Sequence, residues 1–295
     1  MTVLNLNSVG SLTIDGILTR NGHYTLSGPT VSLFPEVPSR PQSTLPLAQN
    51  LHATATLGEW SGHGQVAQVY ELSNVQIQGS ALPVDIPPLV VKVAFKHRVA
   101  SLAREAWFYD ELESLQGPVV PRCYGWFEMD LRTSPKEAPY TVIGWPKSTM
   151  FGTDPCIERE LSHERVPHAM LVERDSRRDI LSILVLEKLG NTLRWKQSGK
   201  LPKGTYKDVY ALYHKIAQLG ISMAEDISLN DILRAPPPPI DAQSVTTSPG
   251  PDSGTVNHMY RIIDFDMAVK TNRTPEILAQ DHDCEITQMF DESRP

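Results

Sequence analysis

The stretch PLVVKVAFKHRVASLAREAWFYDELESL, residues 88–115, predicts a β-strand followed directly by an amphipathic helix. Residues 88–96 form a nearly unbroken apolar and β-branched run, which is typical of a buried strand. In residues 101–115 the apolar positions recur at helical spacing, and Gln116-Gly117-Pro118 ends the helix. These apolar positions are Leu102, Ala106, Tyr109, Leu112 and Leu115.

Strand patterns lie on both sides of this stretch, and helical spacing returns further along the chain. Two strand patterns precede it and two follow it, at residues 53–62, 64–73, 119–128 and 182–190. Residues 206–221 repeat apolar side chains at helical spacing, and residues 258–270 return to a buried strand that ends in acidic residues. This order of strands and helices predicts an α+β fold.

The composition is that of an acidic protein able to bury a sizeable core. The chain has 295 residues, of which 40% are hydrophobic and 21% are charged. Its 27 Lys and Arg against 34 Asp and Glu give a net charge of −7, which argues against a nucleic-acid partner and a polybasic membrane anchor. No apolar run approaches the roughly 18 residues of a membrane-spanning helix. Residues 1–15 lack the pattern of a secretory signal.

The three cysteines, Cys123, Cys156 and Cys284, are far apart and odd in number. Such spacing provides neither a disulfide framework nor a zinc site. We therefore expect free thiols in a reducing compartment, the cytosol or the nucleus, and no disulfide-linked partner.

A glycine motif and a lysine lie on consecutive predicted strands. Residues 62–70, GHGQVAQVY, fit G-x-G-x-x-G-x-V with Ala67 at the third glycine, and such a hairpin lets backbone N–H groups approach phosphates. A plain hairpin turn would show the same glycines. Lys92 interrupts the next apolar run, where its charge must be paired or must face water from an edge strand. Glu105 in the following helix is a natural partner, and the ion pair would leave the ammonium aimed at a phosphate.

Two pairs of aspartates follow later in the chain. Asp226 and Asp231 are five residues apart after the second predicted helix, and Asp264 and Asp266 follow two buried isoleucines. Carboxylates at strand ends and in loops are ligands that Mg²⁺ takes together with phosphates. Taken singly, each of these residues is typical of a solvated loop, so the order of the motifs carries the argument.

That order resembles the order of parts in protein kinases. In sequence come a glycine-rich hairpin, a strand lysine, a helix glutamate, an apolar strand ending in glutamate, a helix, a D-x₄-D loop and D-F-D. The segments REAWFYDELESLQGPVVPRCYGWF and IIDFDMA are especially similar to the divergent protein-kinase-like proteins of mushroom-forming fungi. The resemblance covers about residues 58–270, with insertions. It implies a two-lobe fold with a β-rich N-lobe, which holds one main helix, and a small, truncated helical C-lobe.

The resemblance also implies an ATP site. Lys92, paired with Glu105, would hold the α- and β-phosphates, and Leu186 would be the gatekeeper before residues 187–189, which would contact adenine. The full set of ATP-binding residues would be Gly62, Gly64, Ala67, Val69, Lys92, Leu186, Glu187 and Leu189.

The same resemblance implies catalytic and metal-binding roles for the aspartates. Asp226 would be the base that orients a substrate hydroxyl, and it would act with Lys92 and Glu105. The Mg²⁺ ligands would be Asp231, Asp264 and Asp266.

Four departures from the family pattern bear on catalysis. The catalytic loop reads Ala224-Glu225-Asp226, so the histidine that braces this loop in the family is missing. Asp231 replaces the metal-binding asparagine, and Asp266 replaces the glycine of D-F-G, which is closer to small-molecule kinases of the aminoglycoside and choline type. The short remainder carries no Ala-Pro-Glu motif, so we expect a small lower lobe without the usual peptide platform.

The register of the catalytic loop has two readings. Counting back from Ile232-Leu233 places Asp226 and Asp231 on the motif, whereas counting forward from Gly220-Ile221 places Glu225 and Asn230 there. We prefer the first because it keeps the apolar residues in place.

We expect three regions along the chain. They are a partly ordered extension at 1–50, a kinase-like N-lobe at 51–190 with a charged insertion at 130–180, and a C-lobe at 191–295 with a proline-rich loop at 236–254.

Three functions are compatible with these motifs. The first is ATP-dependent phosphoryl transfer to a Ser/Thr of an unknown protein or to a small-molecule hydroxyl. The second is a pseudokinase that binds nucleotide or acts as a scaffold. The third is an unrelated α+β interaction domain in which the order of motifs is accidental.

Overall fold

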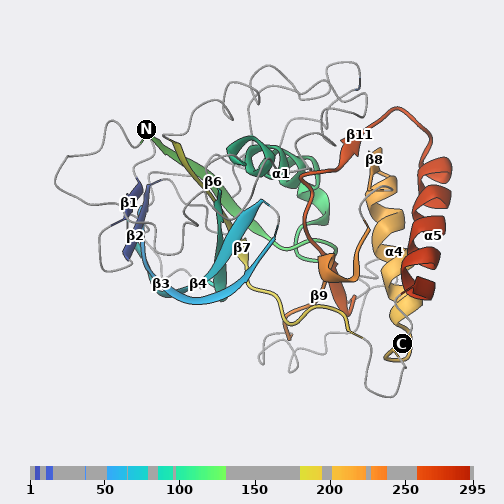
Figure 1. Ribbon diagram of the computed structural model, residues 1–295, viewed down its shortest axis with the longest axis horizontal. Helices are drawn as coiled ribbons and strands as arrows, with labels where there is room; N and C mark the ends of the chain where they lie inside the picture. The colour runs from blue at the N-terminus through green and yellow to red at the C-terminus, as the bar shows by residue number, and fades with distance from the viewer. Residues whose placement is uncertain are drawn as a thin grey trace, which may run out of the picture. The chain divides into compact units, whose positions relative to one another are not determined.

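The computed structural model is an α+β protein, as the sequence predicts (Figure 1). It describes residues 4–6, 11–15, 37, 52–64, 66–78, 86–95, 98–130, 180–194, 201–223, 227–237 and 258–292. Most of the predicted charged insertion, residues 131–179, and most of the proline-rich loop, residues 238–257, therefore lie outside the described residues.

The described residues fall into two compact units. The sheet unit draws on Met1–Thr25, Leu45–Arg104 and Tyr124–Val185, and the helical unit on Leu26–Thr44, Glu105–Cys123 and Leu186–Pro295. The boundary passes through helix α1, between Arg104 and Glu105. The predicted boundaries at residues 50 and 190 stay a prediction.

The sheet unit contains almost all of a seven-stranded sheet in the order β1-β2-β3-β4-β5-β7-β6. Neighbouring strands from β1 to β5 pair antiparallel. The strands predicted at residues 53–62, 64–73, 88–96, 119–128 and 182–190 are confirmed, whereas β1 and β2 were not predicted. The bounds are β1 Leu4–Leu6, β2 Ser11–Asp15, β3 His52–His63, β4 Ala67–Gln78, β5 Leu89–Ala94, β6 Cys123–Asp130 and β7 Ile180–Glu187.

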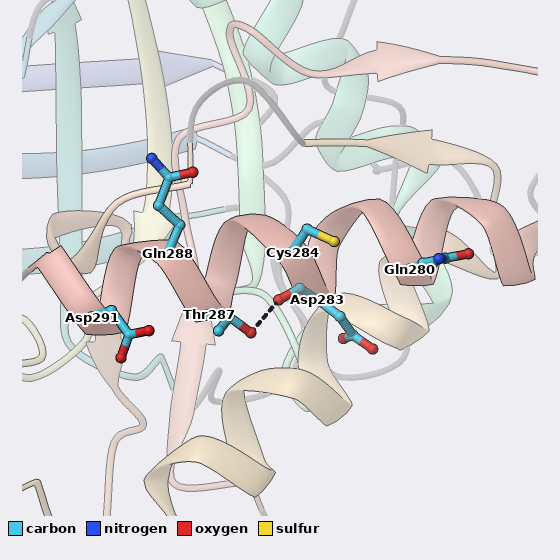
Figure 2. Close-up of a pocket in the computed structure, with 6 residues that line it drawn as sticks. All are labelled: Gln280, Asp283, Cys284, Thr287, Gln288 and Asp291. Atoms are coloured by element: carbon cyan, nitrogen blue, oxygen red, sulfur yellow. Dashed lines mark hydrogen bonds between the residues drawn. The ribbon is translucent and has the colours of Figure 1, made fainter.

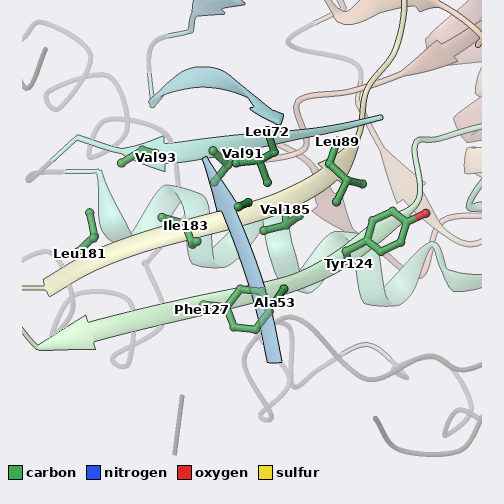
Figure 3. Packing of buried hydrophobic residues seen from close by; sticks show 11 residues of the cluster. Ala53, Leu72, Leu89, Val91, Val93, Tyr124, Phe127, Leu181, Ile183 and Val185 are labelled. Carbon is green, nitrogen blue, oxygen red and sulfur yellow. The ribbon is translucent and has the colours of Figure 1, made fainter. Parts of the chain in front are cut away.

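One face of this sheet carries the apolar core of the unit (Figure 3). Because side chains alternate along a strand, Leu89, Val91 and Val93 of β5 enter the core while Lys92 projects from the opposite face. Burial of the three apolar side chains in the core therefore determines that the Lys92 side chain projects from the other face. Its buried members are Ala53, Ala55, Leu72, Leu89, Val91, Val93, Tyr124, Phe127, Leu181, Ile183 and Val185.

Helix α1, Val99–Glu111, continues into a 3-10 turn at Glu113–Leu115, which confirms the predicted helix. The turn ends at Gly117, whose φ of +92° favours glycine. Buried Gln116 joins the helix to β6, because its Nε2 donates to the Tyr109 carbonyl at 2.8 Å and its Oε1 accepts from the Cys123 N–H at 2.9 Å. Both polar ends of this buried amide are therefore satisfied.

Among its described residues, the helical unit contains the second half of α1, two further helices and two small antiparallel sheets. Helices α4, Thr205–Ala217, and α5, Pro275–Glu292, contact each other through Tyr210 and Thr287, whose hydroxyls are 2.7 Å apart. One sheet pairs β8, Ile221–Ser222, with β11, Val269–Lys270, and the other pairs β9, Ile232–Arg234, with β10, Tyr260–Ile262.

Helix α5 was not predicted from the sequence. Its buried side chains do recur at helical spacing, but the histidine among them interrupts the apolar pattern. Thr274 and Pro275 also form an N-terminal signature, since the Thr274 hydroxyl accepts the Ile277 N–H at 3.5 Å. The buried positions are Leu278, His282, Ile286, Met289 and Phe290.

His282 is the polar member of this buried row. Its Nε2 accepts the Met223 N–H at 2.9 Å, and its Nδ1 lies 3.3 Å from the Tyr213 carbonyl oxygen, so the neutral ring carries its proton on Nδ1. Burial lowers the pKa of His282 to about 4, although the Tyr213 carbonyl and the charges of Asp281 and Asp283 act in the opposite direction. The folded protein therefore holds His282 neutral at pH 7.

Within the described part of the chain, each helix is too short or too polar to cross a membrane.

We expect His282 to make the protein less stable in acid. An unfolded histidine binds a proton near pH 6.5, whereas folded His282 does so only near pH 4. Between these values the unfolded state binds more protons, so the free energy of unfolding should fall by about 2 kcal/mol from pH 7 to pH 4.5, at roughly 1.4 kcal/mol per pKa unit. Urea denaturation at both pH values measures this loss.

His282→Phe, which keeps a ring but cannot titrate, should remove this part of the pH dependence. His214→Gln is the control. The His214 side chain is 44% exposed, so this variant should still lose stability between pH 7 and pH 4.5. Equal pH dependence in the wild type and His282→Phe would contradict the assignment.

Candidate functional site

In the sheet unit, Gly62, Val69 and Lys92 lie side by side on three neighbouring strands. Gly62 pairs with Val69, and Val69 pairs with Lys92. Directly paired residues project from the same face of a sheet, so these three, here called the lysine row, share the face opposite the apolar core. Lys92 is only 8% exposed, which is unusual for a lysine.

The glycine hairpin leaves side-chain space at Gly62. A Cβ built on Gly62 would meet no atom within 4 Å, so the fold does not require glycine there for close packing. The exposed Gly64 donates its N–H to the Ala67 carbonyl at 3.0 Å, which closes the turn, and buried Ala67 pairs with Ala94. All four predicted phosphate-loop residues therefore lie on the β3–β4 hairpin, with open space at Gly62.

In the helical unit, the β9–β10 hairpin brings Asp231 and Asp264 to one end. Ile232 pairs with Ile262, and the Ile263 N–H donates to the Asp231 carbonyl at 2.9 Å, so Asp264 is the next residue along. We call this arrangement of β9, β10 and the two aspartates the carboxylate hairpin. Two predicted metal ligands from distant parts of the sequence therefore lie at one hairpin end.

Asp264 has a left-handed backbone conformation, with φ of +69°. Such a conformation in a residue other than glycine costs on the order of 1 kcal/mol or more, although aspartate tolerates it better than most. Residues held in this way by the surrounding structure are concentrated at functional sites. The observation supports a functional role for Asp264.

Tyr109 connects the carboxylate hairpin with α1. Burial raises the pKa of Tyr109 well above its ordinary value, and Glu105, Cys123 and Asp264 raise it further through their charges. The Tyr109 ring also meets the Phe265 ring edge-on, with centroids 5.4 Å apart. Glu105 and Asp264, two predicted site residues, are thus both close enough to influence the same buried hydroxyl.

A buried ion pair links the end of α1 to the segment after the carboxylate hairpin. Lys270 Nζ lies 2.7 Å from Glu111 Oε2, and both side chains are less than 10% exposed. Lys270 lies on β11, four residues beyond Asp266, which is itself buried. This pair therefore fixes the backbone that follows Asp264 and Asp266 against the helix that carries Glu105.

The first residues of the segment that includes the predicted gatekeeper and adenine contacts, residues 186–189, are buried and stabilise the fold. Leu186 and Glu187 are buried at the end of β7, and Glu187 pairs with Arg122 through Oε1 and Nη1 at 2.8 Å. Its Oε2 and its N–H also bind the Arg122 backbone, at 3.2 Å and 2.9 Å. The Glu187 side chain therefore serves the fold, and half-buried Leu189 is the more accessible of the predicted contacts.

Several predicted site residues are not brought together by these observations. Asp226, like Glu225 in the alternative register, lies outside the described residues. Lys92 belongs to the sheet unit, whereas Glu105 and Asp264 belong to the helical unit, so the ion pair between Lys92 and Glu105 stays a prediction. Within the described ranges, no three or more His, Cys, Asp or Glu side chains form a group suited to a metal ion.

A shallow hollow of about 570 Å³ lies on the outer face of α5, and no predicted site residue lines it (Figure 2). The residues around it are mostly of polar types, and two of them are bonded within the fold. Asp283 pairs with His214 at 2.8 Å, and Thr287 donates to the Asp283 carbonyl at 2.7 Å. The residues around it are Gln280, Asp283, Cys284, Thr287, Gln288 and Asp291.

The chain matches no model of a known protein family and no curated protein. The lysine row and the carboxylate hairpin are therefore interpreted from their own chemistry. A buried ammonium is a group that can bind a phosphate, and carboxylates are groups that can bind a divalent cation.

We expect the contributions of Glu111 and Lys270 to the free energy of unfolding to depend strongly on each other. Lys270→Met leaves the buried Glu111 carboxylate without its ammonium, which should lower the free energy of unfolding by about 3–5 kcal/mol. Replacing both residues by Met should restore most of that loss, because neither charge then remains buried. Chemical denaturation of the two single variants and the double variant measures the coupling.

The matched control is the exposed pair Arg273–Asp281, whose nitrogen and oxygen are 2.6 Å apart. Arg273→Ala should cost less than about 1 kcal/mol because solvent screens an exposed pair. If the double variant lost as much free energy of unfolding as the two single variants together, the two charges would not depend on each other.

Proposed function

We propose that the chain is a protein-kinase-like protein that binds ATP and Mg²⁺ and transfers a phosphoryl group to a protein Ser/Thr or small-molecule hydroxyl. The lysine row carries the proposal: Lys92 is buried, lies on the sheet face opposite the core, and shares its row with Gly62, where side-chain space is open. Phosphate is a ligand that an ammonium in such a position can bind.

The carboxylate hairpin supports the metal part of the proposal. Mg²⁺ is usually bound by one or two carboxylates together with substrate phosphates, so Asp231 and Asp264 fit this ion. Asp231 is half-buried beside the strand that leads to Asp264, whereas Asn230 is exposed, which favours the register with Asp226 and Asp231. Asp266, two residues beyond Asp264, would be a further carboxylate ligand.

The two compact units support the proposed two-lobe fold. The sheet unit would be the N-lobe, and the helical unit would supply the small C-lobe. Phosphoryl transfer depends mainly on positioning and on neutralising charge. Lys92 would hold the α- and β-phosphates, the metal would offset the charge of the transferred group, and Asp226 would orient the acceptor hydroxyl.

The second candidate function is a pseudokinase, a nucleotide-binding or scaffolding module. The substitutions in the catalytic loop favour it, because Ala224 replaces the bracing histidine and Asp231 adds a negative charge at the metal site. In either case we propose the cytosol or the nucleus as the compartment, on the cysteine spacing alone.

Mg-ATP should raise the melting temperature of the wild type. A ligand at 100 times its Kd stabilises the native state by about 2.7 kcal/mol, and this should be visible as a rise of several degrees. Lys92→Met and Asp264→Asn should each lose most of that rise, since they remove the proposed phosphate and metal contacts. Differential scanning fluorimetry with and without Mg-ATP measures the shift.

Lys207→Met is the matched control, because it removes an exposed lysine of α4 and should keep the full rise. The same rise in all four proteins would refute the proposed roles of Lys92 and Asp264.

Transfer of labelled phosphate separates the two candidate functions. The wild type should label itself or a generic Ser/Thr substrate, and Asp226→Asn should lower the rate by about 100-fold or more, the order of a general-base contribution. Glu225→Gln is the control for the alternative register and should leave the rate unchanged. Nucleotide binding without any labelling above the Asp226→Asn level would support the pseudokinase.

A further inference from the structure

A single side chain, that of Arg261, connects the carboxylate hairpin to the turn that follows α1. Arg261 lies on β10, three residues before Asp264, and is only 8% exposed. Its Nε donates to the Gly117 carbonyl, and its Nη1 donates to the carbonyls of His258 at 3.0 Å and Tyr260 at 2.7 Å. The guanidinium therefore binds the turn and the backbone of its own strand at the same time.

We propose that Arg261 is a positioning residue for Asp264, a metal ligand of the proposed phosphotransferase. By fixing β10 against the turn at Gly117, it sets the point at which Asp264 leaves the strand beside Asp231. The inference rests on the proposed function, because Asp264 needs this placement only if it binds a metal.

The carboxylate hairpin is too small to hold its register by itself. Strands β9 and β10 are three residues long each, and their pairing runs from Tyr260 opposite Arg234 to Ile262 opposite Ile232. A single two-stranded hairpin of this kind is at best marginally stable in water. A slip of one residue would turn every side chain of β10 to the other face and displace Asp264 along the chain. Contacts outside the hairpin are therefore needed to fix β10.

The turn after α1 supplies these contacts on the edge of β10 that faces away from β9. The Ile262 N–H donates to the Val119 carbonyl at 3.0 Å, close to the bond from Arg261 to Gly117. The turn is itself closed, because the Gly117 N–H donates to the Val120 carbonyl at 2.7 Å. Strand β10 is therefore bonded to β9 on one edge and to a closed turn on the other.

Arg261 acts through hydrogen bonds to carbonyl groups and not through an ion pair. Burial lowers its pKa, with Glu187 and Asp208 acting in the opposite direction and Arg122 in the same direction. Both carboxylates already have partners among the described residues, since Glu187 pairs with Arg122 at 2.8 Å and Asp208 with His258 at 2.6 Å. A buried cation without a paired carboxylate is costly, so the bonds to three carbonyls are what the fold gains from it.

Exchange of the Ile262 amide hydrogen tests without any nucleotide whether Arg261 fixes β10. We expect Arg261→Met, which keeps an unbranched side chain but no donor, to speed this exchange at pH 7 by about tenfold, as the loss of hydrogen bonds to the turn predicts. Arg261→Lys keeps the charge but lacks the planar fork of donors, so its rate should lie within about threefold of the Met variant. Residue-resolved exchange by NMR measures these rates.

Arg234→Met is the matched control, because Arg234 is an exposed arginine of the paired strand β9 and its loss should leave the Ile262 amide protected. Amides in the middle of α4 are the internal reference, and their exchange should be the same in all four proteins. Equal loss of protection at Ile262 and in α4 would overturn the proposal, because Arg261 would then support the whole unit and not the hairpin. Unchanged exchange at Ile262 in Arg261→Met would overturn it as well.

The Mg²⁺ dependence of the stabilisation by ATP tests the consequence for Asp264. At a fixed ATP concentration, Arg261→Met should raise the Mg²⁺ concentration that gives half of the rise in melting temperature by about tenfold, the order of effect expected when the support of a metal ligand is lost. Arg234→Met should need the same Mg²⁺ concentration as the wild type. Differential scanning fluorimetry over a series of Mg²⁺ concentrations measures these midpoints.

A double variant shows whether Arg261 acts through Asp264. Asp264→Asn should need at least as much Mg²⁺ as Arg261→Met, and combining the two substitutions should change the midpoint by less than about threefold beyond Asp264→Asn alone. Effects that multiply in the double variant, or an unchanged midpoint in Arg261→Met, would overturn the positioning role. If the wild type shows no rise that depends on Mg²⁺, the proposed function fails, while exchange at Ile262 still decides whether Arg261 fixes the hairpin.

Discussion

Buried charge on and around α1 is the constraint on which the interpretation of this fold depends. Glu105, Asp110 and Glu111 are each 5% exposed or less, and carboxylates are almost never buried to this extent without partners. For Glu111 the partner is Lys270, from the strand that follows Asp264 and Asp266. Removing an ion from water costs several kcal/mol, so the helix and this strand are stable in their positions only together.

The sequence predicted the elements whose side chains follow a clear period. Strands β3 to β7 and helices α1 and α4 belong to this class, because each buries a regular apolar face. Helix α5 was not predicted, because buried His282 occupies one of its inward positions and interrupts the apolar pattern, and its outer face is acidic. Strands β1 and β2 are short, and their place in the sheet depends on pairing with β3, which no local pattern reveals.

The site residues also divide into those that the sequence pattern could place and those that it could not. Hairpin geometry follows from the sequence, so the row of Gly62, Val69 and Lys92 and the meeting of Asp231 with Asp264 could be anticipated from the order of the motifs. Tyr109 had a local signal, since it is four residues after Glu105 and so on the same side of the helix. Lys270 and His282 had none, because each acts on a partner dozens of residues away.

His282 holds the backbone of Met223, the residue before the position where the family pattern has its histidine. A residue inside the loop and a residue on another helix can hold the same backbone, because a hydrogen bond fixes a position whichever element supplies it. On the proposed function, the additional charge of Asp231 is the departure that would distinguish an active phosphotransferase from a protein that only binds nucleotide.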